Sequence, residues 1–163
     1  MSFTLSPLTP EDREPVLAIF NHYVVHGFAA YPEHEMPPAF YDTLLGVCRG
    51  YPNAAVRGPA GEVLGFGLLR PYSPISSFAR TAEITYFLRP DATGQGIGVR
   101  LLEFLLEGAR RQGIVNILAS VSSRNEGSLR FHARHGFVEC ARFRAIGEKR
   151  GKPFDVVYFQ RTL

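Results

Sequence analysis

Three glycines within five residues constrain this chain more than any other feature. The run Gly94-Gln95-Gly96-Ile97-Gly98 separates a stretch rich in β-branched and aromatic residues from one with the apolar spacing of an amphipathic helix. This pattern predicts a strand, a tight turn and the start of a helix. Glycines let the backbone approach a ligand closely, and a helix begins with unpaired N–H groups and the positive end of its dipole. We therefore expect a phosphorylated ligand at this turn.

Two familiar phosphate-binding turns do not match the flanking residues. A P-loop needs Lys and then Ser or Thr after its glycines, whereas Val99 and Arg100 follow Gly98. A dinucleotide-binding turn follows the first strand of its fold, whereas this turn lies beyond the middle of the chain, after a predicted hairpin. The flanks exclude a P-loop and argue against a dinucleotide fold.

The bulk composition predicts one globular domain, residues 1–163. Hydrophobic residues make up 45% of the chain and charged residues 20%, which suits a single core. The net charge of +3 comes without a run of like charges, so charge alone does not indicate nucleic-acid binding. Cys48 and Cys140 lie far apart and indicate neither a disulfide framework nor a thiolate metal site. Because Met1 to Leu5 lack the pattern of a signal peptide and no segment is apolar over a membrane's width, we expect a cytoplasmic protein.

The periodicity of apolar residues predicts strands and helices in a definite order. Helices are expected at residues 10–26, 39–49, 97–112 and 125–135. Strands are expected at residues 3–5, 54–57, 62–69, 81–88, 115–121, 137–146 and 154–162, with a polar turn at 147–151. The order β-α-α-β-β-β-α-β-α-β-β predicts an α/β (α+β) fold, a mixed sheet with helices on both faces.

Three short segments resemble the GCN5-related N-acetyltransferase (GNAT) superfamily, and the resemblance extends over nearly the whole chain. The segment Thr93-Gly94-Gln95-Gly96-Ile97-Gly98 is similar to the superfamily's pyrophosphate motif, with Thr93 in place of a leading Arg or Gln. Asn125 followed by Ser128, and then His135-Gly136-Phe137, are similar to two further segments in the same order. The resemblance implies that the turn binds acetyl-CoA, mainly through backbone amides because Thr93 lacks the usual side chain.

Four local segments make the chain similar to the phosphinothricin acetyltransferase branch. They are Asn21-His22-Tyr23, Thr81-Ala82-Glu83, Arg130-Phe131-His132 and the stretch from Gly151 to Arg161. Phe154 and Phe159 stand where the branch usually has Trp, and its Phe-Arg-Thr-Glu-Pro segment has no counterpart before Pro38. The resemblance implies a sheet of about seven mostly antiparallel strands and a homodimer. It also implies acetyl transfer to the amino group of phosphinothricin, methionine sulfone, methionine sulfoximine or a similar small amine.

Glu83 and His132 are the residues to which this resemblance assigns chemistry. Acetyl transfer from a thioester needs a neutral amine and a proton for the departing thiolate. Glu83, in mid-strand among apolar residues, is expected to act as a base through water because burial raises the pKa of a carboxylate. The alternative is a glutamate that faces solvent or pairs with Arg80. His132 is expected near the CoA sulfur, and the alternative is a packed helix histidine without chemistry.

The same resemblance implies a set of binding residues. Those expected to contact acetyl-CoA are Tyr86, Phe87, Leu88, Gly94, Gln95, Gly96, Ile97, Gly98, Val99 and Asn125. The three strand residues would contact the acetyl group and pantetheine arm through their backbone, and the turn would contact the pyrophosphate. Asn125 would bind the pantetheine arm, cap its helix, or do both. On the acceptor side, Tyr31 and Phe78 are expected to line a pocket, and Arg80 meets a substrate carboxylate or forms a surface pair.

Two further polar groups have alternative interpretations. His22 and His26 stand one helical turn apart, a spacing that can bind zinc, but no Glu follows His22 as in H-E-x-x-H, and we expect no metal. The basic residues between Arg142 and Lys152 could contact nucleic acid, although a solvated hairpin near an acidic substrate fits better. We therefore expect neither a nucleic-acid nor a membrane partner.

Two other functions stay open on the sequence alone. A fold of this kind could bind acyl-CoA as a sensor without turnover, against which the presence of both Glu83 and His132 argues. Acetylation of protein amino groups would need a peptide groove, and the resemblance to the phosphinothricin branch points away from it. Binding of acetyl-CoA without turnover of any amine would favour the sensor.

Overall fold

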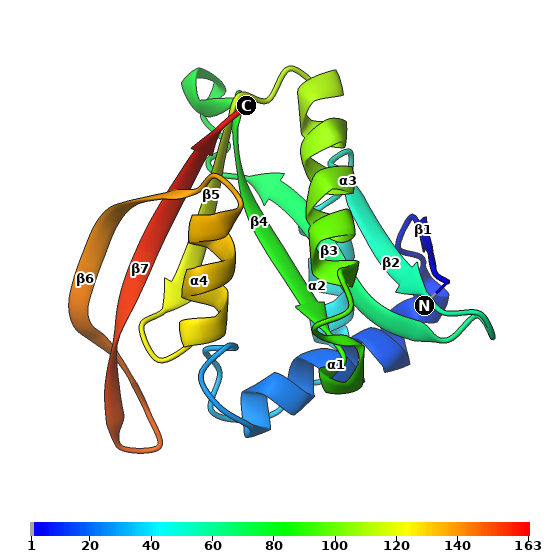
Figure 1. Ribbon diagram of the computed structural model, residues 1–163, viewed down its shortest axis with the longest axis horizontal. Coiled ribbons are helices and arrows are strands. Elements are labelled where there is room, and N and C mark those ends of the chain that lie inside the picture. Colours follow the sequence, from blue (N-terminus) through cyan, green and yellow to red (C-terminus); the bar gives the residue numbers. More distant parts are fainter. Residues whose placement is uncertain (1) are drawn as a thin grey trace.

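Seven strands form one mixed sheet in the computed structural model, which describes residues 2–163 (Figure 1). In space the strands follow the order β1-β2-β3-β4-β5-β7-β6. Their bounds are β1 Thr4–Ser6, β2 Asn53–Arg57, β3 Val63–Pro71, β4 Thr81–Leu88, β5 Asn116–Ser122, β6 Val138–Lys149 and β7 Lys152–Thr162. All neighbours are antiparallel except β4 and β5, which are parallel. The mostly antiparallel sheet confirms the predicted fold class.

Helices cover both faces of the sheet, as the sequence predicts. Their bounds are α1 Arg13–Val25, α2 Ala39–Val47, α3 Ile97–Arg111 and α4 Glu126–Arg134, with short 3₁₀ turns at Pro10–Asp12, Ser76–Phe78 and Pro90–Ala92. On one face, α1 and α2 enclose a core that includes Phe66 and Leu68 of β3. On the other face, Leu101 and Leu105 of α3 pack in a second core. The alternation of side chains along the strands separates these two cores.

Gly67 lets α3 approach the sheet closely. A Cβ atom built at this position would lie 3.0 Å from Leu105 Cδ1 and 3.1 Å from Leu101 Cδ2, tighter than ordinary packing. A glycine in mid-strand often marks such a close approach of a neighbouring element. Gly67 therefore allows α3 to pack closely on β3 at Leu101 and Leu105.

The hairpin of β6 and β7 differs from the prediction. The sequence predicts that its first strand ends at residue 146, but β6 continues to Lys149, and the turn lies at residues 150–151. The register shifts between Phe143 and Gly147, and Ala145 has a φ of 51°. Such a bulge inserts residues without ending the pairing, so a polar stretch can stay in the strand. The first helix was predicted from residue 10, but α1 begins at Arg13 after a 3₁₀ turn, and the other element ends lie within two residues of prediction.

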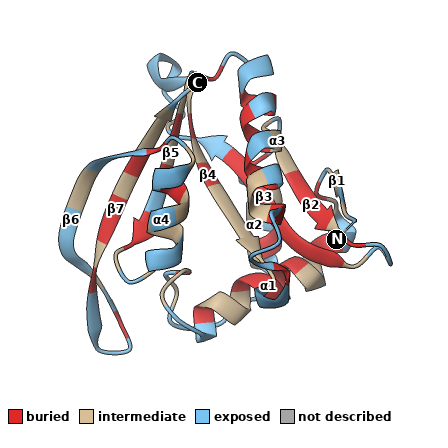
Figure 2. Cartoon of the chain, in the orientation of Figure 1, coloured by how far each residue is buried: buried red, intermediate tan, exposed pale blue. Residues whose placement is uncertain are grey.

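Exposure is uneven across the sheet (Figure 2). The inner strand β3 is buried over most of its length, whereas the edge strand β6 is mainly exposed. Among residues 2–163, no helix combines the length and the apolar character that crossing a membrane requires.

Candidate active site

The strands β4 and β5 form a wedge at the centre of the molecule. They pair only between Thr81–Glu83 and Asn116–Leu118. Beyond Glu83 they diverge (Figure 1), while β4 stays paired with β3 as far as Leu88 and β5 with β7 as far as Ser122. Both strands line a cavity of about 390 Å³ in this region. Strand edges that have left a ladder can hydrogen-bond an extended ligand.

The glycine turn lies just beyond the end of β4, at the start of α3. Gly94 and Gly96 have φ values of 73° and 78°, in the left-handed region that favours glycine, and Gly96 is the N-cap of α3. Among residues 2–163, no acceptor pairs with the backbone N–H groups of residues 94–99. This cluster of free N–H groups at a helix start suits a phosphate or pyrophosphate.

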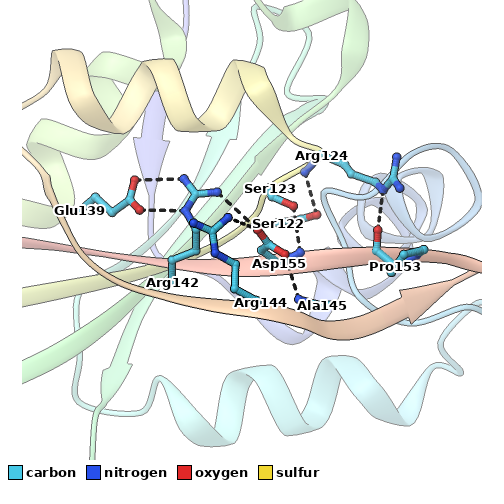
Figure 3. Close-up of polar contacts among 9 residues, drawn as sticks. All are labelled: Ser122, Ser123, Arg124, Glu139, Arg142, Arg144, Ala145, Pro153 and Asp155. Carbon is cyan, nitrogen blue, oxygen red and sulfur yellow. Dashed lines mark hydrogen bonds and ion pairs between the residues drawn. The ribbon is translucent and has the colours of Figure 1, made fainter.

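Asn125 starts α4 beside the cavity. Its Oδ1 accepts a hydrogen bond from Ser128 N at 3.2 Å, so the predicted N-cap is present. The residues before it are attached to β7, because Ser123 N donates to Asp155 O and Asp155 N donates to Ser123 Oγ, each at 2.9 Å (Figure 3). The loop that carries Asn125 is therefore held at a fixed place on the sheet.

A polar cluster around Asp155 reinforces this attachment (Figure 3). The Asp155 carboxylate accepts from Ala145 N at 2.8 Å and from Arg144 Nη1 at 3.3 Å, and Arg142 approaches it to 3.6 Å. The hydrogen bond from Ala145 N, followed by the charges of the two arginines, lowers the pKa of Asp155. The cluster thus joins the bulge of β6 to β7 beside the loop before Asn125.

His132 is buried on α4 and bonded to Tyr86 of β4. The two atoms Tyr86 Oη and His132 Nε2 lie 2.6 Å apart, and His132 Nδ1 lies 2.8 Å from Ser128 O. Only 3% of His132 is exposed, and burial lowers its pKa. Burial also raises the pKa of Tyr86. Both side chains lie in the wall of the cavity, so the predicted histidine is at the site, with a tyrosine hydroxyl as its partner.

Glu83 also lines the cavity, but its surroundings are not apolar. Its Oε2 lies 2.5 Å from Arg70 Nη2 and accepts a second hydrogen bond from Arg70 Nε at 3.1 Å. The two residues are direct register partners on β3 and β4. The partner of Glu83 is therefore Arg70 and not Arg80, and the contact leaves Oε1 of Glu83 outside the pair.

Tyr31 reaches the cavity from the loop between α1 and α2. Its hydroxyl lies 2.7 Å from Ser120 Oγ on β5, and its ring stacks on Phe154 with centroids 5.7 Å apart. Burial is the largest cause of a raised pKa for Tyr31, and the nearby Tyr158 and Glu83 raise it further. This loop residue therefore lies in the same cavity as the Glu83–Arg70 pair.

The end of the β6–β7 hairpin holds this loop in place. Lys149 is fully buried, and its Nζ donates to Ala30 O at 2.7 Å. Arg150 N donates to Glu33 Oε1 at 2.7 Å, and its guanidinium donates to Gly27 O at 2.7 Å. Burial lowers the pKa of Lys149. We call Lys149 and Arg150 the clasp. The basic hairpin is mainly exposed, as predicted, and Lys149 is the exception because its ammonium binds the backbone of the loop between α1 and α2.

Comparison with known proteins identifies the family. The sequence model of the Acetyltransferase (GNAT) family matches residues 16–137. The L-methionine sulfoximine/L-methionine sulfone acetyltransferase of Pseudomonas aeruginosa is 32% identical over 100% of this chain and 96% of the relative. This chain belongs to the acetyltransferase (GNAT) family. It is therefore an acetyltransferase by family.

Other similar acetyltransferases cover the same full length. The phosphinothricin N-acetyltransferase of Streptomyces coelicolor is 29% identical over 96% of this chain and 94% of its own. A phosphinothricin acetyltransferase from Sinorhizobium meliloti, solved in complex with AcCoA, superposes with a TM-score of 0.93 at 25% identity, over 100% of this chain and 89% of that one. The resemblance inferred from the sequence motifs is thus confirmed.

Part of the predicted site of this acetyltransferase, including Tyr31, lines the wedge cavity, and the predicted glycine turn lies outside its lining. Tyr86, Phe87 and Asn125 line the cavity with Glu83 and His132. The backbone carbonyl of Leu88 is already taken, because Tyr23 Oη donates to it at 2.6 Å. Gly94 to Val99 form the turn at the adjacent helix start.

Two predicted acceptor residues do not line the cavity. Phe78 is 42% exposed and contacts Tyr72 on the loop between β3 and β4. Arg80 Nε donates to Gly113 O at 3.3 Å beyond the end of α3. Both precede β4, whereas the cavity opens toward the other end of that strand, so chain proximity to Glu83 does not place them at the site.

Several site residues are absent from the sequence-based prediction. Arg70, Ser120, the Tyr86 hydroxyl and Lys149 owe their positions to contacts across the sheet or between distant segments. The alternation in β3 could have placed Arg70 opposite Glu83, had the register been known. His22 and His26 stack with centroids 4.6 Å apart, and within the described part of the chain no three His, Cys, Asp or Glu side chains are placed to hold a metal.

Proposed function

We propose that this acetyltransferase transfers acetyl from acetyl-CoA to the α-amino group of a small amino-acid-like acceptor, of the methionine sulfone, methionine sulfoximine or phosphinothricin type. The observation that carries this proposal is the Glu83–Arg70 pair in the wall of the wedge cavity. An α-amino acid presents one ammonium and one carboxylate a short distance apart. A neighbouring glutamate and arginine match those two charges.

The donor side of the site fits acetyl-CoA. The free N–H groups of residues 94–99 would hold the pyrophosphate, and the Asn125 side chain would hydrogen-bond the pantetheine arm. The edge of β4 beyond Glu83 would receive the thioester end, through the backbone of Tyr86 and Phe87. Acetyl-CoA supplies an activated acyl group, and the protein positions it.

The acceptor side provides both recognition and proton removal. Arg70 would bind the acceptor carboxylate in a charge-assisted pair, which draws its guanidinium away from Glu83. Glu83, through Oε1 or a water, would then take the first proton from the ammonium and leave a neutral amine. His132 would provide the proton for the departing thiolate. Tyr31 closes the cavity over the acceptor.

We also propose that residues 1–163 act as one cytoplasmic domain that assembles as a homodimer. Support for a dimer comes from large apolar side chains left exposed on the edge strand β6, where Val138 is 69%, Phe143 48% and Ile146 62% exposed. Sedimentation equilibrium tests the assembly. A monomer at high protein concentration would overturn it without affecting the enzymatic proposal.

Release of free CoA thiol with a panel of amines tests the acceptor class. L-Methionine sulfone, L-methionine sulfoximine and phosphinothricin are expected to give turnover. Each is compared with its decarboxylated amine, which keeps the nucleophile but cannot pair with Arg70, and is expected to react at least ten-fold less efficiently. Equal efficiency of the paired compounds would overturn the role of Arg70.

Two further measurements distinguish this proposal from protein acetylation and from a sensor without turnover. A peptide with a free amino terminus tests protein acetylation, and calorimetric binding of acetyl-CoA tests the donor site on its own. Binding without turnover of any amine would leave a sensor. Turnover of the peptide alone would redirect the acceptor class to proteins.

A further inference from the structure

The hydrogen bonds of His132 determine where its proton resides. The carbonyl of Ser128 can only accept, so the contact of 2.8 Å requires a proton on His132 Nδ1. In the neutral ring Nε2 then carries no proton and must accept. The Tyr86 hydroxyl, 2.6 Å away, is therefore the donor of the Tyr86–His132 bond.

The surroundings keep both groups neutral before a reaction. His132 is enclosed by the rings of Tyr86 and Phe159, nearly parallel at 5.6 and 5.5 Å, and by the edge contact of Phe137 at 5.0 Å. Of the elements packed against it, β4 contributes the titratable Tyr86, β7 contributes apolar Phe159, and its own helix contributes His135. Burial lowers the pKa of His132, the smaller effect of the hydrogen bond to the Ser128 carbonyl opposes that shift, and His135 lowers the pKa further.

Tyr86 and His132 both line the cavity, and Tyr86 is the more exposed of the two. With 3% of its surface exposed, His132 presents almost nothing to a substrate. Tyr86 lies in the cavity wall on the strand that diverges from β5, and its oxygen keeps lone pairs that are not used by His132. Because Nε2 is hydrogen-bonded to the Tyr86 hydroxyl, a proton exchanged between Nε2 and a substrate would pass through that hydroxyl.

We propose that Tyr86 and His132 form a proton shuttle that carries one proton from the acceptor nitrogen to the CoA sulfur, with Tyr86 as the catalytic residue and His132 as its positioning and proton-holding partner. This inference rests on the proposed function. It replaces direct protonation of the thiolate by His132 with transfer through the tyrosine hydroxyl.

The step balances without any further reactant. The amine forms the C–N bond, and the carbonyl π electrons move to oxygen, which leaves an extra proton on nitrogen. The Tyr86 oxygen takes that proton as its own proton moves to His132 Nε2. The electron pair on the carbonyl oxygen then re-forms the C=O bond as the C–S bond breaks and its electron pair goes to sulfur. Tyr86 donates a proton to sulfur and recovers one from Nε2. Both side chains end as they began.

Two substitutions interrupt the shuttle at different atoms. Tyr86→Phe removes the hydroxyl and keeps the ring. His132→Asn keeps an amide donor in the region of Nδ1 and has no counterpart of Nε2. Each is expected to lower kcat roughly a hundred-fold, the scale of lost acid–base catalysis. The double variant is expected to fall no further, because either change breaks the same path.

Tyr41→Phe is the matched control for loss of a buried tyrosine hydrogen bond. Tyr41 is fully buried and donates to Thr9 O at 2.6 Å, away from the cavity. Its variant is expected to lose thermal stability to a similar degree as Tyr86→Phe while keeping wild-type kcat. Calorimetry is expected to give unchanged acetyl-CoA affinity for all these variants. A Tyr86→Phe enzyme with wild-type kcat would overturn the shuttle while leaving the acetyltransferase proposal intact.

Two readouts separate the shuttle from a purely structural pair. The wild-type kcat is expected to fall at acidic pH as His132 takes up a proton, and the Tyr86→Phe variant is expected to lack that limb. Nitrogen-15 NMR of the ligand-free protein is expected to show the neutral Nδ1–H tautomer of His132. The Nε2–H tautomer would refute the shuttle, whereas failure of every amine in the panel would refute the proposed function instead.

Discussion

The donor and acceptor sides of the cavity are built in different ways. On the proposed donor side, the end of β4, the glycine turn and the start of α3 follow one another in the chain, and free backbone N–H groups would provide most of the contacts. On the proposed acceptor side, the residues Arg70, Tyr31 and Ser120 come from separate segments, and their side chains form the contacts that shape the cavity. A local segment therefore specifies the donor site, and long-range packing specifies the acceptor site.

This difference explains how one fold can keep a donor and vary its acceptor. The N–H groups at a helix start are present whatever the side chains are, provided that the glycines allow the turn. The loop that carries Tyr31 depends instead on the clasp, on Phe154 and on Ser120. Substitution in any of these would reshape the acceptor cavity without touching the turn.

The largest expected effect tests the backbone of the donor side. Gly96→Val places a β-branched residue at a φ of 78°, which costs about 1–3 kcal/mol of strain and puts side-chain atoms where a ligand would lie. We expect acetyl-CoA affinity, measured by calorimetry, to fall roughly a hundred-fold. Gly98→Ala is the control, because its added Cβ would make only ordinary contacts at 3.6–3.7 Å. Equal losses in both variants would contradict a conformational role for Gly96.

The next effect isolates the charge of the acceptor side. Arg70→Met is expected to raise the acceptor KM roughly twenty-fold, because a charge-assisted pair is lost, with acetyl-CoA affinity unchanged. Steady-state kinetics with L-methionine sulfone measures it. Arg80→Met should leave the KM unchanged, since Arg80 contacts Gly113 away from the cavity. A larger effect at Arg80 than at Arg70 would reverse the assignment of the acceptor side.

A smaller effect tests the loop between α1 and α2. Tyr31→Phe removes the hydrogen bond to Ser120 but keeps the stack on Phe154, so the acceptor KM should rise roughly five-fold, equivalent to about 1 kcal/mol. Tyr72→Phe is the control, because Tyr72 is 46% exposed on the loop between β3 and β4. If Tyr31→Phe changes acetyl-CoA affinity instead, the two sides are not independent.

The smallest expected effect is on the pH dependence of folding stability, to which His132 in the cavity wall and Lys149 of the clasp contribute in different pH ranges. The pKa of His132 is lowered in the folded state, so the unfolded chain binds more protons below about pH 6.5, and stability falls as the pH drops through this range. The pKa of Lys149 is also lowered, so stability rises as the pH climbs from its folded pKa toward about 10.4. Urea denaturation across pH should show the acid trend disappear in His132→Asn and the alkaline trend disappear in Lys149→Met. Trends that persist in these variants would assign them to other groups.

The sequence predicted the elements and the glycine turn well because both depend on neighbours in the chain. Apolar periodicity predicted the strands and helices in order, and the glycine turn followed from local backbone needs. The histidine on α4 was also found, through its motif. The local pattern could not reveal that Tyr86 Oη meets its Nε2, since that contact joins residues 46 positions apart.

The acceptor side was predicted less well for the same physical reason. Phe78 and Arg80 were chosen because they precede Glu83 in the chain, yet the register of β3 brings Arg70 to Glu83 instead. Lys149 was expected in solvent because most lysines are exposed. Instead β6 continues past the bulge at Ala145, and the Lys149 ammonium donates a hydrogen bond to the backbone carbonyl of Ala30.

By itself, the sequence determined the order of helices and strands, the glycine turn and the membership in an acetyltransferase family. Helix starts, strands and turns depend on residues close together in the chain, so short sequence patterns reveal them. Only the tertiary structure decided which groups meet in the cavity: Arg70 with Glu83, Tyr86 with His132, and the clasp with the loop that carries Tyr31. These contacts depend on strand register and on the divergence of β4 from β5, which packing of the whole chain fixes. The proposed donor site is the glycine turn, which depends on local sequence, whereas the proposed acceptor site depends on the surrounding fold.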